Sequence, residues 1–221
     1  MEKHYHGHRS RLKERFSQNP DSMFDYEIVE LILGYVVKGK DVKPMAKDLL
    51  KQCGGISGIF GCKPSDIKGL GEESDIFFRL IREFYHRVNL DKAEKEKSLV
   101  DSPDKVYEFL KYHIGYSEKE VFVVLLLDSS NGVKGYEVMS EGTVNQANVY
   151  PREIANKALQ KGATAAIICH NHPSANLKPS NDDLRITRKI KEGLSLFDIA
   201  LLDHLIITSK GFLSFKREGY I

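Results

Sequence analysis

The chain has 221 residues, of which 41% are hydrophobic, and its 33 Lys and Arg nearly balance its 31 Asp and Glu. Residues 1–100 carry 18 basic and 16 acidic side chains, so neither half has the basic excess of a nucleic-acid-binding cassette. No apolar run approaches the roughly 18 residues that a membrane helix needs, and the N-terminal segment is polar where a secretory signal is apolar. Composition therefore predicts a cytoplasmic protein of one or two domains with no membrane partner.

Residues 1–90 have the pattern of a small all-helical domain. Apolar residues recur at helical spacing over 24–37, 42–53 and 74–88, and a Gly-x-Gly turn at Gly69 and Gly71 precedes the last of these segments. Residues 91–101 are charged and poor in apolar side chains, which is typical of a linker. The domain boundary is therefore placed there.

Residues 102–221 have a different sequence pattern, which is typical of a mixed α/β domain. The apolar run 121–127 is short enough to be a strand buried on both faces, and the turn signal at 128–132 predicts a hairpin. The remaining predicted elements are helices over 103–114, 151–160 and 180–196 and strands over 133–139, 163–170, 199–208 and 212–215. This order predicts an α/β (α+β) fold, in which helices flank a mixed sheet, preceded by the small all-α domain.

The eight histidines are unevenly distributed. Two of them, His170 and His172, end a predicted strand, whereas three alternate near the N-terminus. The terminal trio, interpreted as a mobile polar segment, is His4, His6 and His8. His204 follows Asp203, but adjacent strand residues point to opposite faces, so the pair is interpreted as structural rather than as a proton relay.

The three cysteines show no spacing typical of a disulfide framework or a zinc ribbon. Cys53, Cys62 and Cys169 are therefore predicted to be reduced thiols, mostly buried. Cys169 precedes His170, but strand alternation turns its sulfur to the opposite face, so it is predicted to belong to the core.

Residues 169–184 hold the constellation with the clearest chemistry. His170 and His172 project to one face of a strand, Pro173 ends that strand, and Ser180 begins a helix that carries Asp183. Two imidazoles and one carboxylate hold a tetrahedral zinc ion and leave a fourth position for water, as in catalytic sites. Zinc lowers the pKa of such a water to about 7, so the predicted reaction class is hydrolysis.

A structural interpretation exists for the same residues. Ser180 and Asp183 have the spacing of a capping box, and an isolated His-x-His at a strand end is usually a pair of surface side chains that bind no metal. The coincidence of both motifs within fourteen residues, 170–183, favours the metal site.

The segment resembles the JAMM (also called JAB or MPN) metalloproteases, whose signature is His-x-His followed by Ser-x-x-Asp. The resemblance implies that His170, His172 and Asp183 hold one zinc ion per chain and that Ser180 helps to polarise the scissile carbonyl. His-Asn-His-Pro-Ser, with Gly142-Thr143 and Pro151-Arg152-Glu153, is similar to the bacterial RadC branch over most of residues 101–221. That branch usually carries glycine where this chain has Ala175.

A general base is needed to move protons between water and the leaving nitrogen. Glu120 lies between a predicted helix and strand, a context that resembles the place of the family's catalytic glutamate. Glu141 and Glu153 are the alternatives. The substrate expected from the resemblance is a peptide or isopeptide bond in a protein, while the sequence leaves the oligomeric state open.

The N-terminal segment is similar to the helical leader of the RadC branch, and residues 67–71 resemble a helix-hairpin-helix turn. A DNA-associated repair or recombination factor, either a binding module or a metal-dependent nuclease, is therefore the alternative function. Glu72, Glu73 and Asp75 stand where a bound phosphate would lie and would repel it. The cations that could make a modest contact with DNA are Arg9, Arg11, Lys13 and Arg15.

Overall fold

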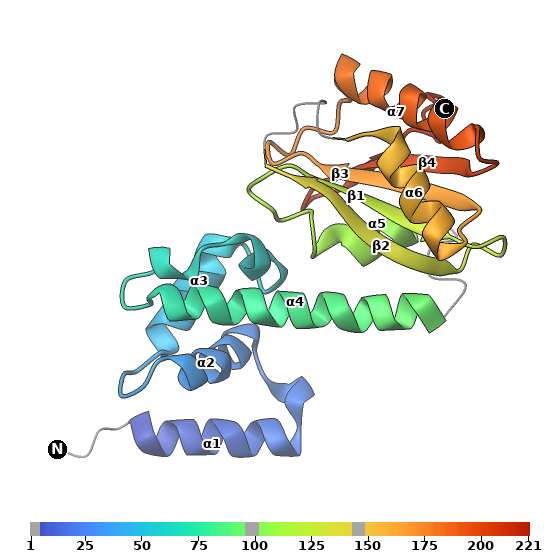
Figure 1. Ribbon diagram of the computed structural model, residues 1–221. Helices are drawn as coiled ribbons and strands as arrows, with labels where there is room; N and C mark the ends of the chain where they lie inside the picture. The colour runs from blue at the N-terminus through green and yellow to red at the C-terminus, as the bar shows by residue number, and fades with distance from the viewer. Residues whose placement is uncertain (1–4, 96–101, 143–148) are drawn as a thin grey trace. The chain divides into compact units, whose positions relative to one another are not determined.

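The computed structural model describes residues 5–95, 102–142 and 149–221. The chain divides into two compact units, Met1–Arg82 and Glu83–Ile221. The first is helical, and the second is built on a five-stranded mixed sheet flanked by helices (Figure 1). The predicted fold class, an α+β domain preceded by a small helical domain, is confirmed. Within the described residues, no helix is long and apolar enough to cross a lipid bilayer.

The helices of the first unit enclose a small apolar core. Helices α2 and α3 pack against each other and bury Val29, Leu33 and Leu49 completely. Pro44 lies in the first turn of α3, and Gly54 ends the helix in the left-handed conformation at φ 71°. The elements of this unit, in chain order, are α1 (Tyr5–Gln18), η1 (Pro20–Ser22), α2 (Asp25–Val36), α3 (Lys43–Cys53), η2 (Ser57–Gly61), η3 (Pro64–Asp66) and the start of α4 (Glu72–Lys95).

The first helix is fastened to the second, so the prediction of a mobile terminus is wrong for His8. His8 belongs to α1, and its Nε2 lies 2.9 Å from Oε1 of the buried Glu30 on α2. Leu12, one turn later in α1, is also buried. A buried carboxylate needs a polar partner, and His8 is placed to provide it. His4 and the side chain of His6 lie outside the described part of the chain.

Cys53 and Cys62 form a disulfide, which contradicts the prediction that all three cysteines are reduced thiols. Helix α3 ends at Cys53, and η2 turns back against α3 so that Cys62 follows beside it. This packing brings the two Cα atoms to 5.8 Å, within the usual range for a disulfide. The pairing depends on the tertiary contact between α3 and η2, which residue spacing alone does not reveal. Cys169 is a free, buried cysteine, as predicted.

The Gly-x-Gly turn before α4 allows close packing. Gly69 has φ +99°, and a Cβ atom added there would lie 2.5 Å from Cε of Met45 on α3. Glycine is therefore favoured by the backbone conformation, and any side chain added here would also displace the end of the Met45 side chain. The first turn of α4 carries three carboxylates, Glu72, Glu73 and Asp75, as the sequence indicates.

Helix α4 continues past the predicted end of the helical domain at residue 90, and the boundary between the compact units falls within it. Its last turns remain helical because Leu90 and Ala93 pack into the apolar core of the second unit. The first part of the predicted linker is thus helical, while residues 96–101 lie outside the described residues.

The second unit contains the sheet, whose strands lie in the order β2-β1-β3-β4-β5. Strands β3 and β4 are parallel, and the other neighbours are antiparallel. Helix α7 makes the crossover that a parallel pair requires. The elements are α5 (Pro103–Lys111), β1 (Val121–Leu127), β2 (Val133–Glu141), α6 (Pro151–Lys161), β3 (Ala165–Asn171), α7 (Asn181–Ser195), β4 (Ala200–Ile207) and β5 (Phe212–Ser214).

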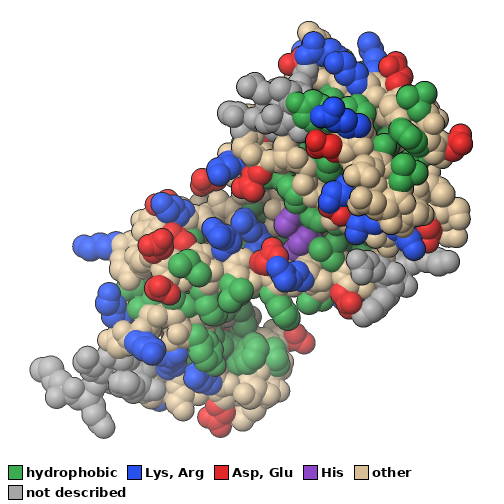
Figure 2. All heavy atoms as spheres, in the orientation of Figure 1, with side chains coloured by type: hydrophobic (Ala, Val, Ile, Leu, Met, Phe, Trp, Pro, Cys, Tyr) green, Lys and Arg blue, Asp and Glu red, His purple; other side chains and the backbone are tan. Residues whose placement is uncertain are grey.

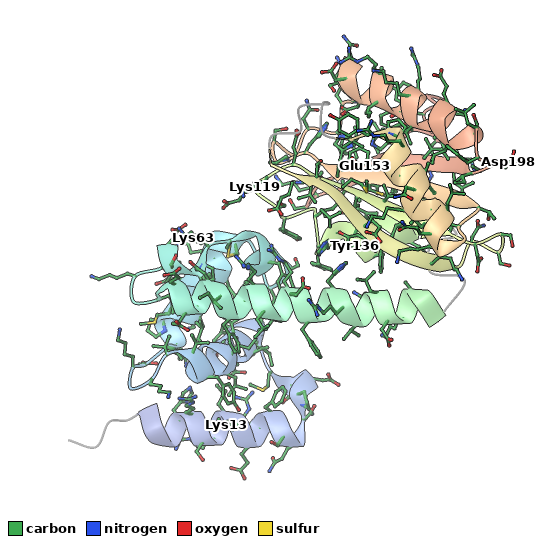
Figure 3. The ribbon with its side chains drawn as sticks, viewed as in Figure 1. Lys13, Lys63, Lys119, Tyr136, Glu153 and Asp198 are labelled. Atoms are coloured by element: carbon green, nitrogen blue, oxygen red, sulfur yellow. A yellow bond between two sulfur atoms is a disulfide. The ribbon has the colours of Figure 1, made fainter. Side chains whose placement is uncertain are left out.

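Both faces of the sheet are covered, with α6 and α7 on one face and α5 and the end of α4 on the other (Figure 1). Strand β1 is buried throughout, as predicted, since Val123 and Leu125 face the α5 layer whereas Phe122 and Val124 face the α6 and α7 layer. Tyr136 of β2 packs on the α5 side (Figure 3). Alternation along the strands therefore decides which side chains reach the layer that contains α7.

Candidate metal centre

The two histidines of the His-x-His motif meet at the C-terminal end of β3. Cys169 packs into the core on the α5 side of the sheet, so strand alternation turns His170 to the side of α7. His170 is buried, and His172 follows the strand directly. Their Nε2 atoms lie 2.9 Å apart. The structure thus brings the two imidazoles together as the sequence predicts.

Asp183 reaches the same point from the first turn of α7, which begins with a capping box. Ser180 accepts a hydrogen bond from the Asp183 N–H at 3.1 Å, while Asp183 Oδ2 accepts from the Ser180 N–H and hydroxyl, both at 2.7 Å. Asp183 Oδ1 lies 3.3 Å from His170 Nε2, and Oδ2 lies 3.7 Å from His172 Nε2. The capping box and the ligand cluster coexist, because the cap orients the carboxylate toward the imidazoles.

The three groups form a donor set that can bind a metal ion. One ligand atom from each of His170, His172 and Asp183 lies within 4.8 Å of the others. Ligand distances of about 2.0–2.1 Å around a tetrahedral zinc ion place donor atoms roughly 3.3 Å apart, so small shifts suffice to accommodate zinc. The residues present fit such an ion in both type and spacing.

The orientation of His172 is set by the loop that follows it. Its Nδ1 lies 2.6 Å from the Asn176 carbonyl oxygen, which can only accept, so Nδ1 carries a hydrogen. Nε2 faces Asp183 and is the nitrogen that a metal ion would take once it has lost its proton. Ala175 in this loop has φ 58°, a left-handed conformation, and its N–H donates to the His172 carbonyl. Glycine, usual at this position in the branch that the sequence resembles, adopts that conformation without steric cost.

The electrostatics of the cluster favour an anionic Asp183. Burial raises the pKa of this carboxyl, but hydrogen bonds with His170, His172 and Ser180 outweigh burial and hold the pKa far below its usual range. The hydrogen bond to Asp183 also raises the pKa of His172, with smaller contributions from the Asn176 carbonyl and the Glu120 carboxylate, against the effect of burial. The cluster therefore concentrates negative charge where a cation would be held.

A cavity of about 350 Å³ opens over the cluster. Its lining includes the apolar residues Phe122, Val149 and Ile186 together with polar groups. The polar residues that line it are Glu120, His170, His172, Ser174, Asn176, Lys178, Ser180, Asp182 and Asp183. The donor set is thus accessible to a ligand from outside.

The three candidate general bases occupy different places. Glu120 lines the cavity, whereas Glu141 and Glu153 are not among its described lining residues. Glu141 is exposed and lies 3.9 Å from Lys119 Nζ, and Glu153 is exposed on the first turn of α6 (Figure 3). Of the three, the described structure therefore places Glu120 at the cavity that contains the donor set.

Sequence reasoning missed three residues that support the cluster. His204 Nε2 lies 2.8 Å from His170 Nδ1, and His204 Nδ1 lies 2.6 Å from Thr187 Oγ1. Asn171, between the two histidines, accepts a hydrogen bond from the Val121 N–H at 2.7 Å. The His-Asn-His motif pointed to Asn171, but no local signal connects His204 or Thr187 with His170.

Asp203 and His204 take different partners, as strand alternation predicts. The Asp203 carboxylate accepts hydrogen bonds from the Ser214 hydroxyl at 2.5 Å and the Lys216 N–H at 3.0 Å. Burial, followed by the charge of His170, lowers the pKa of His204 well below its usual value, so this ring is neutral. The two side chains therefore have separate partners, and the His204 backbone N–H, not its ring, donates to Asp203 Oδ1 at 2.7 Å.

Comparison with known proteins agrees with this geometry. Residues 100–220 match the family described as the RadC-like JAB domain. The chain belongs to this RadC family. It is 40% identical to a UPF0758 protein of Fusobacterium nucleatum over 231 aligned positions that cover 100% of this chain and 99% of that relative. A UPF0758 protein of Paracidovorax citrulli is 36% identical over 96% of each chain. The JAB domain of this RadC family member carries its His/His/Asp cluster at the end of β3, and such a domain fits a metal-dependent hydrolase.

Proposed function

We propose that this RadC family protein is a zinc-dependent hydrolase that cleaves a peptide or isopeptide bond in a protein substrate. The observation that carries the proposal is the convergence of His170, His172 and Asp183 beneath an open cavity. A structural zinc site has four protein ligands, whereas three ligands leave a position for water or substrate. When bound, zinc supplies a Lewis acid and lowers the pKa of a coordinated water to about 7.

The protein's own groups supply orientation and proton transfer. The Glu120 carboxylate lines the cavity, where it can accept a proton from water and return it to the leaving nitrogen. Ser180 also lines the cavity, and its hydroxyl donates to Asp183 Oδ2. To donate to a substrate carbonyl, this hydroxyl must exchange that hydrogen bond, while the Ser180 N–H continues to hold Asp183 at 2.7 Å.

The lining of the cavity supports a peptide-like substrate. Phe122, Val149 and Ile186 offer apolar contact to one side chain next to the reacting bond. Ser174 and Asn176, which line the same cavity, provide polar groups suited to the amides of an extended chain. This mixture of apolar and polar lining residues is compatible with a short segment of polypeptide.

Metal analysis tests the proposal directly. Protein purified without chelator and dialysed against zinc is expected to hold one zinc ion per chain by mass spectrometry of the metal. His170→Ala and His172→Ala should each lose it, while His8→Ala, a histidine of the first unit, should retain it. Cleavage of a mixed peptide library and of an isopeptide-linked pair should follow the metal content. A wild-type chain that takes up no zinc, or an unchanged zinc content in both ligand variants, would overturn the proposal.

We do not extend the proposal to DNA binding. Among the described residues visible in Figure 2, cationic and anionic side chains are interspersed rather than gathered in one basic patch. The hairpin before α4 leads into Glu72, Glu73 and Asp75, whose charges oppose a phosphate at that helix terminus. The role of a DNA-associated factor or nuclease remains a prediction from sequence resemblance alone.

A further inference from the structure

A chain of hydrogen bonds runs behind His170 and returns to α7. His170 Nδ1 lies 2.8 Å from His204 Nε2, and His204 Nδ1 lies 2.6 Å from Thr187 Oγ1. The Thr187 hydroxyl lies 2.5 Å from the carbonyl oxygen of Asp183, one helical turn earlier. These hydrogen bonds therefore connect His170 and Asp183, two residues of the donor set, through His204 and Thr187, which lie outside it.

The direction of each hydrogen bond in this series follows from the Asp183 carbonyl oxygen, at which the series ends. The Asp183 carbonyl can only accept, so the single hydrogen of the Thr187 hydroxyl points to it. Thr187 Oγ1 must then accept from His204 Nδ1–H. A neutral His204 ring with hydrogen on Nδ1 has an unprotonated Nε2, which accepts from His170 Nδ1–H. With its Nδ1–H donated to His204, His170 has Nε2, the atom that faces His172 and Asp183, as its remaining nitrogen for a metal ion.

We propose that His204 and Thr187 are positioning residues that hold His170 in its Nδ1–H tautomer and so direct its Nε2 toward a metal ion. The proposal deepens the proposed function and rests on its metal site. Hydrogen-bond partners behind a ligand histidine fix its tautomer and ring orientation, and their loss typically weakens metal binding 10- to 100-fold.

The surroundings of the two residues suit this role. Both are inaccessible to solvent, with exposures of 0% for His204 and 1% for Thr187. The His204 ring packs between Phe122 and Phe215, with centroids 5.9 and 4.4 Å away. Water therefore does not compete for the ring nitrogens, and each nitrogen has one partner that determines its state.

The backbone arrangement explains why these residues meet. Strand β4 runs parallel to β3, and His170 pairs with Ile206, so His204 lies two positions away on the same face. Thr187 lies four residues after Asp183, so one face of α7 presents both of them to the sheet. The register between β3 and β4 thus brings His204 to His170, and the helical spacing of α7 brings Thr187 to the same side as Asp183.

Zinc affinity of matched threonine variants tests the proposal. Competition with a chromophoric chelator should show a dissociation constant 10- to 100-fold higher for Thr187→Val than for wild type. Thr187→Ser keeps the hydroxyl and should remain within about threefold. If Thr187→Val does not fold, His204→Phe and His204→Gln replace it. Gln retains an acceptor for His170 Nδ1, so it should bind zinc at least tenfold more tightly than Phe, which retains only the ring packing.

Nitrogen-15 spectra of histidine side chains in metal-free protein at pH 8 provide a second readout. Wild type should show His170 protonated at Nδ1. In Thr187→Val, His204 loses the acceptor for its Nδ1–H, so His204 should carry its hydrogen on Nε2 and His170 should switch to Nε2–H. An unchanged tautomer together with unchanged zinc affinity in this variant would overturn the positioning role. Failure of wild type to bind zinc, with the tautomer switch still observed, would instead reject the proposed function.

Discussion

Asp183 illustrates how one residue can close a helix and offer a ligand. Its N–H and Oδ2 belong to the capping box with Ser180, and its carboxylate also faces His170 and His172. The structural and the functional interpretation of Ser-x-x-Asp are therefore not alternatives. The cap removes rotational freedom from the carboxylate before any metal arrives, which is the preorganisation that a precise site needs.

Glu120 should affect proton transfer without affecting metal binding. The carboxylate lines the cavity but does not belong to the cluster of ligand atoms. We expect Glu120→Gln to lower kcat for a cleaved peptide by roughly 10²–10⁴-fold, the usual contribution of a general base. Zinc content should remain that of wild type. The measurement is steady-state cleavage kinetics alongside metal analysis.

Glu141→Gln and Glu153→Gln serve as matched controls for this substitution, since both side chains are exposed and neither is among the described lining residues of the cavity. Both should cleave at the wild-type rate. If Glu120→Gln also retains full activity while one of these controls loses it, Glu120 is not the base.

The sequence predicted the donor set because its ligands are close along the chain. His170, His172 and Asp183 fall within fourteen residues, and local rules of strand alternation and helix capping suffice to bring them together. His204 lies on a different strand, and its contact with His170 depends on the register between β3 and β4. The residue pattern of a single segment cannot predict how two strands are aligned with each other.

At the scale of the secondary-structure elements, the side chain of Asn171, which lies between the two histidines, holds the segment before β1. Asn171 Oδ1 accepts from the Val121 N–H, and Nδ2 donates to the Lys119 carbonyl at 3.0 Å and to the Ser117 carbonyl at 3.3 Å. Glu120 lies inside the segment that these bonds fasten. Strand β3 thus positions one ligand of the donor set, His170, on one face, and the segment that carries Glu120 through the buried amide of Asn171.

Replacing this amide should loosen the segment. Asn171→Ala leaves a buried N–H without its partner, and we expect the free energy of unfolding to fall by about 2–3 kcal/mol. Hydrogen exchange at the Val121 amide should accelerate in the same variant. Urea unfolding and exchange measured by mass spectrometry check the two effects.

Asn156→Ala, on the exposed surface of α6, is the matched control and should change stability by less than about 0.5 kcal/mol. Equal exchange at Val121 in wild type and Asn171→Ala would show that the amide does not hold the segment.

The elements predicted best were those with strong local signals. Ser180 caps α7 as predicted, and the apolar run 121–127 is β1 with the same bounds. Helix α4 is longer than its pattern suggests because Leu90 and Ala93 find apolar partners in the sheet unit. The pairing of Cys53 with Cys62 was missed for the same reason, since a tertiary contact decides it.

At the scale of the whole molecule, folding is coupled to pH through a buried histidine on α4. His86 stacks on His113 with ring centroids 3.5 Å apart, and Tyr136 packs edge-on against it at 5.0 Å. Burial lowers the pKa of His86 to about 4, although Glu83 opposes the shift. Because the unfolded chain binds this proton near pH 6.5, stability should be constant above about pH 7 and should fall as the pH decreases toward 4.

We expect His86→Gln to remove the part of this dependence that His86 contributes, while the buried His204 keeps its own contribution. Between pH 7.5 and pH 5, wild type should lose about 2 kcal/mol more unfolding free energy than the variant, since one pKa unit corresponds to about 1.4 kcal/mol. Urea unfolding with chelator present measures it and removes any contribution from metal binding. Parallel pH profiles for the two proteins would show that His86 is not the group responsible.

The short distance along the chain between the ligands affects the order in which the site can assemble. His170 and Asp183 are 13 positions apart, whereas Glu120 precedes His170 by 50. Loop-closure entropy grows with the logarithm of loop length, so bringing Glu120 to the cluster costs roughly 1.2 kcal/mol more than closing the loop between the ligands. The candidate metal ligands therefore come from one strand end, one loop and one turn of helix that are consecutive in the chain, whereas the proposed base comes from a segment 50 residues before His170.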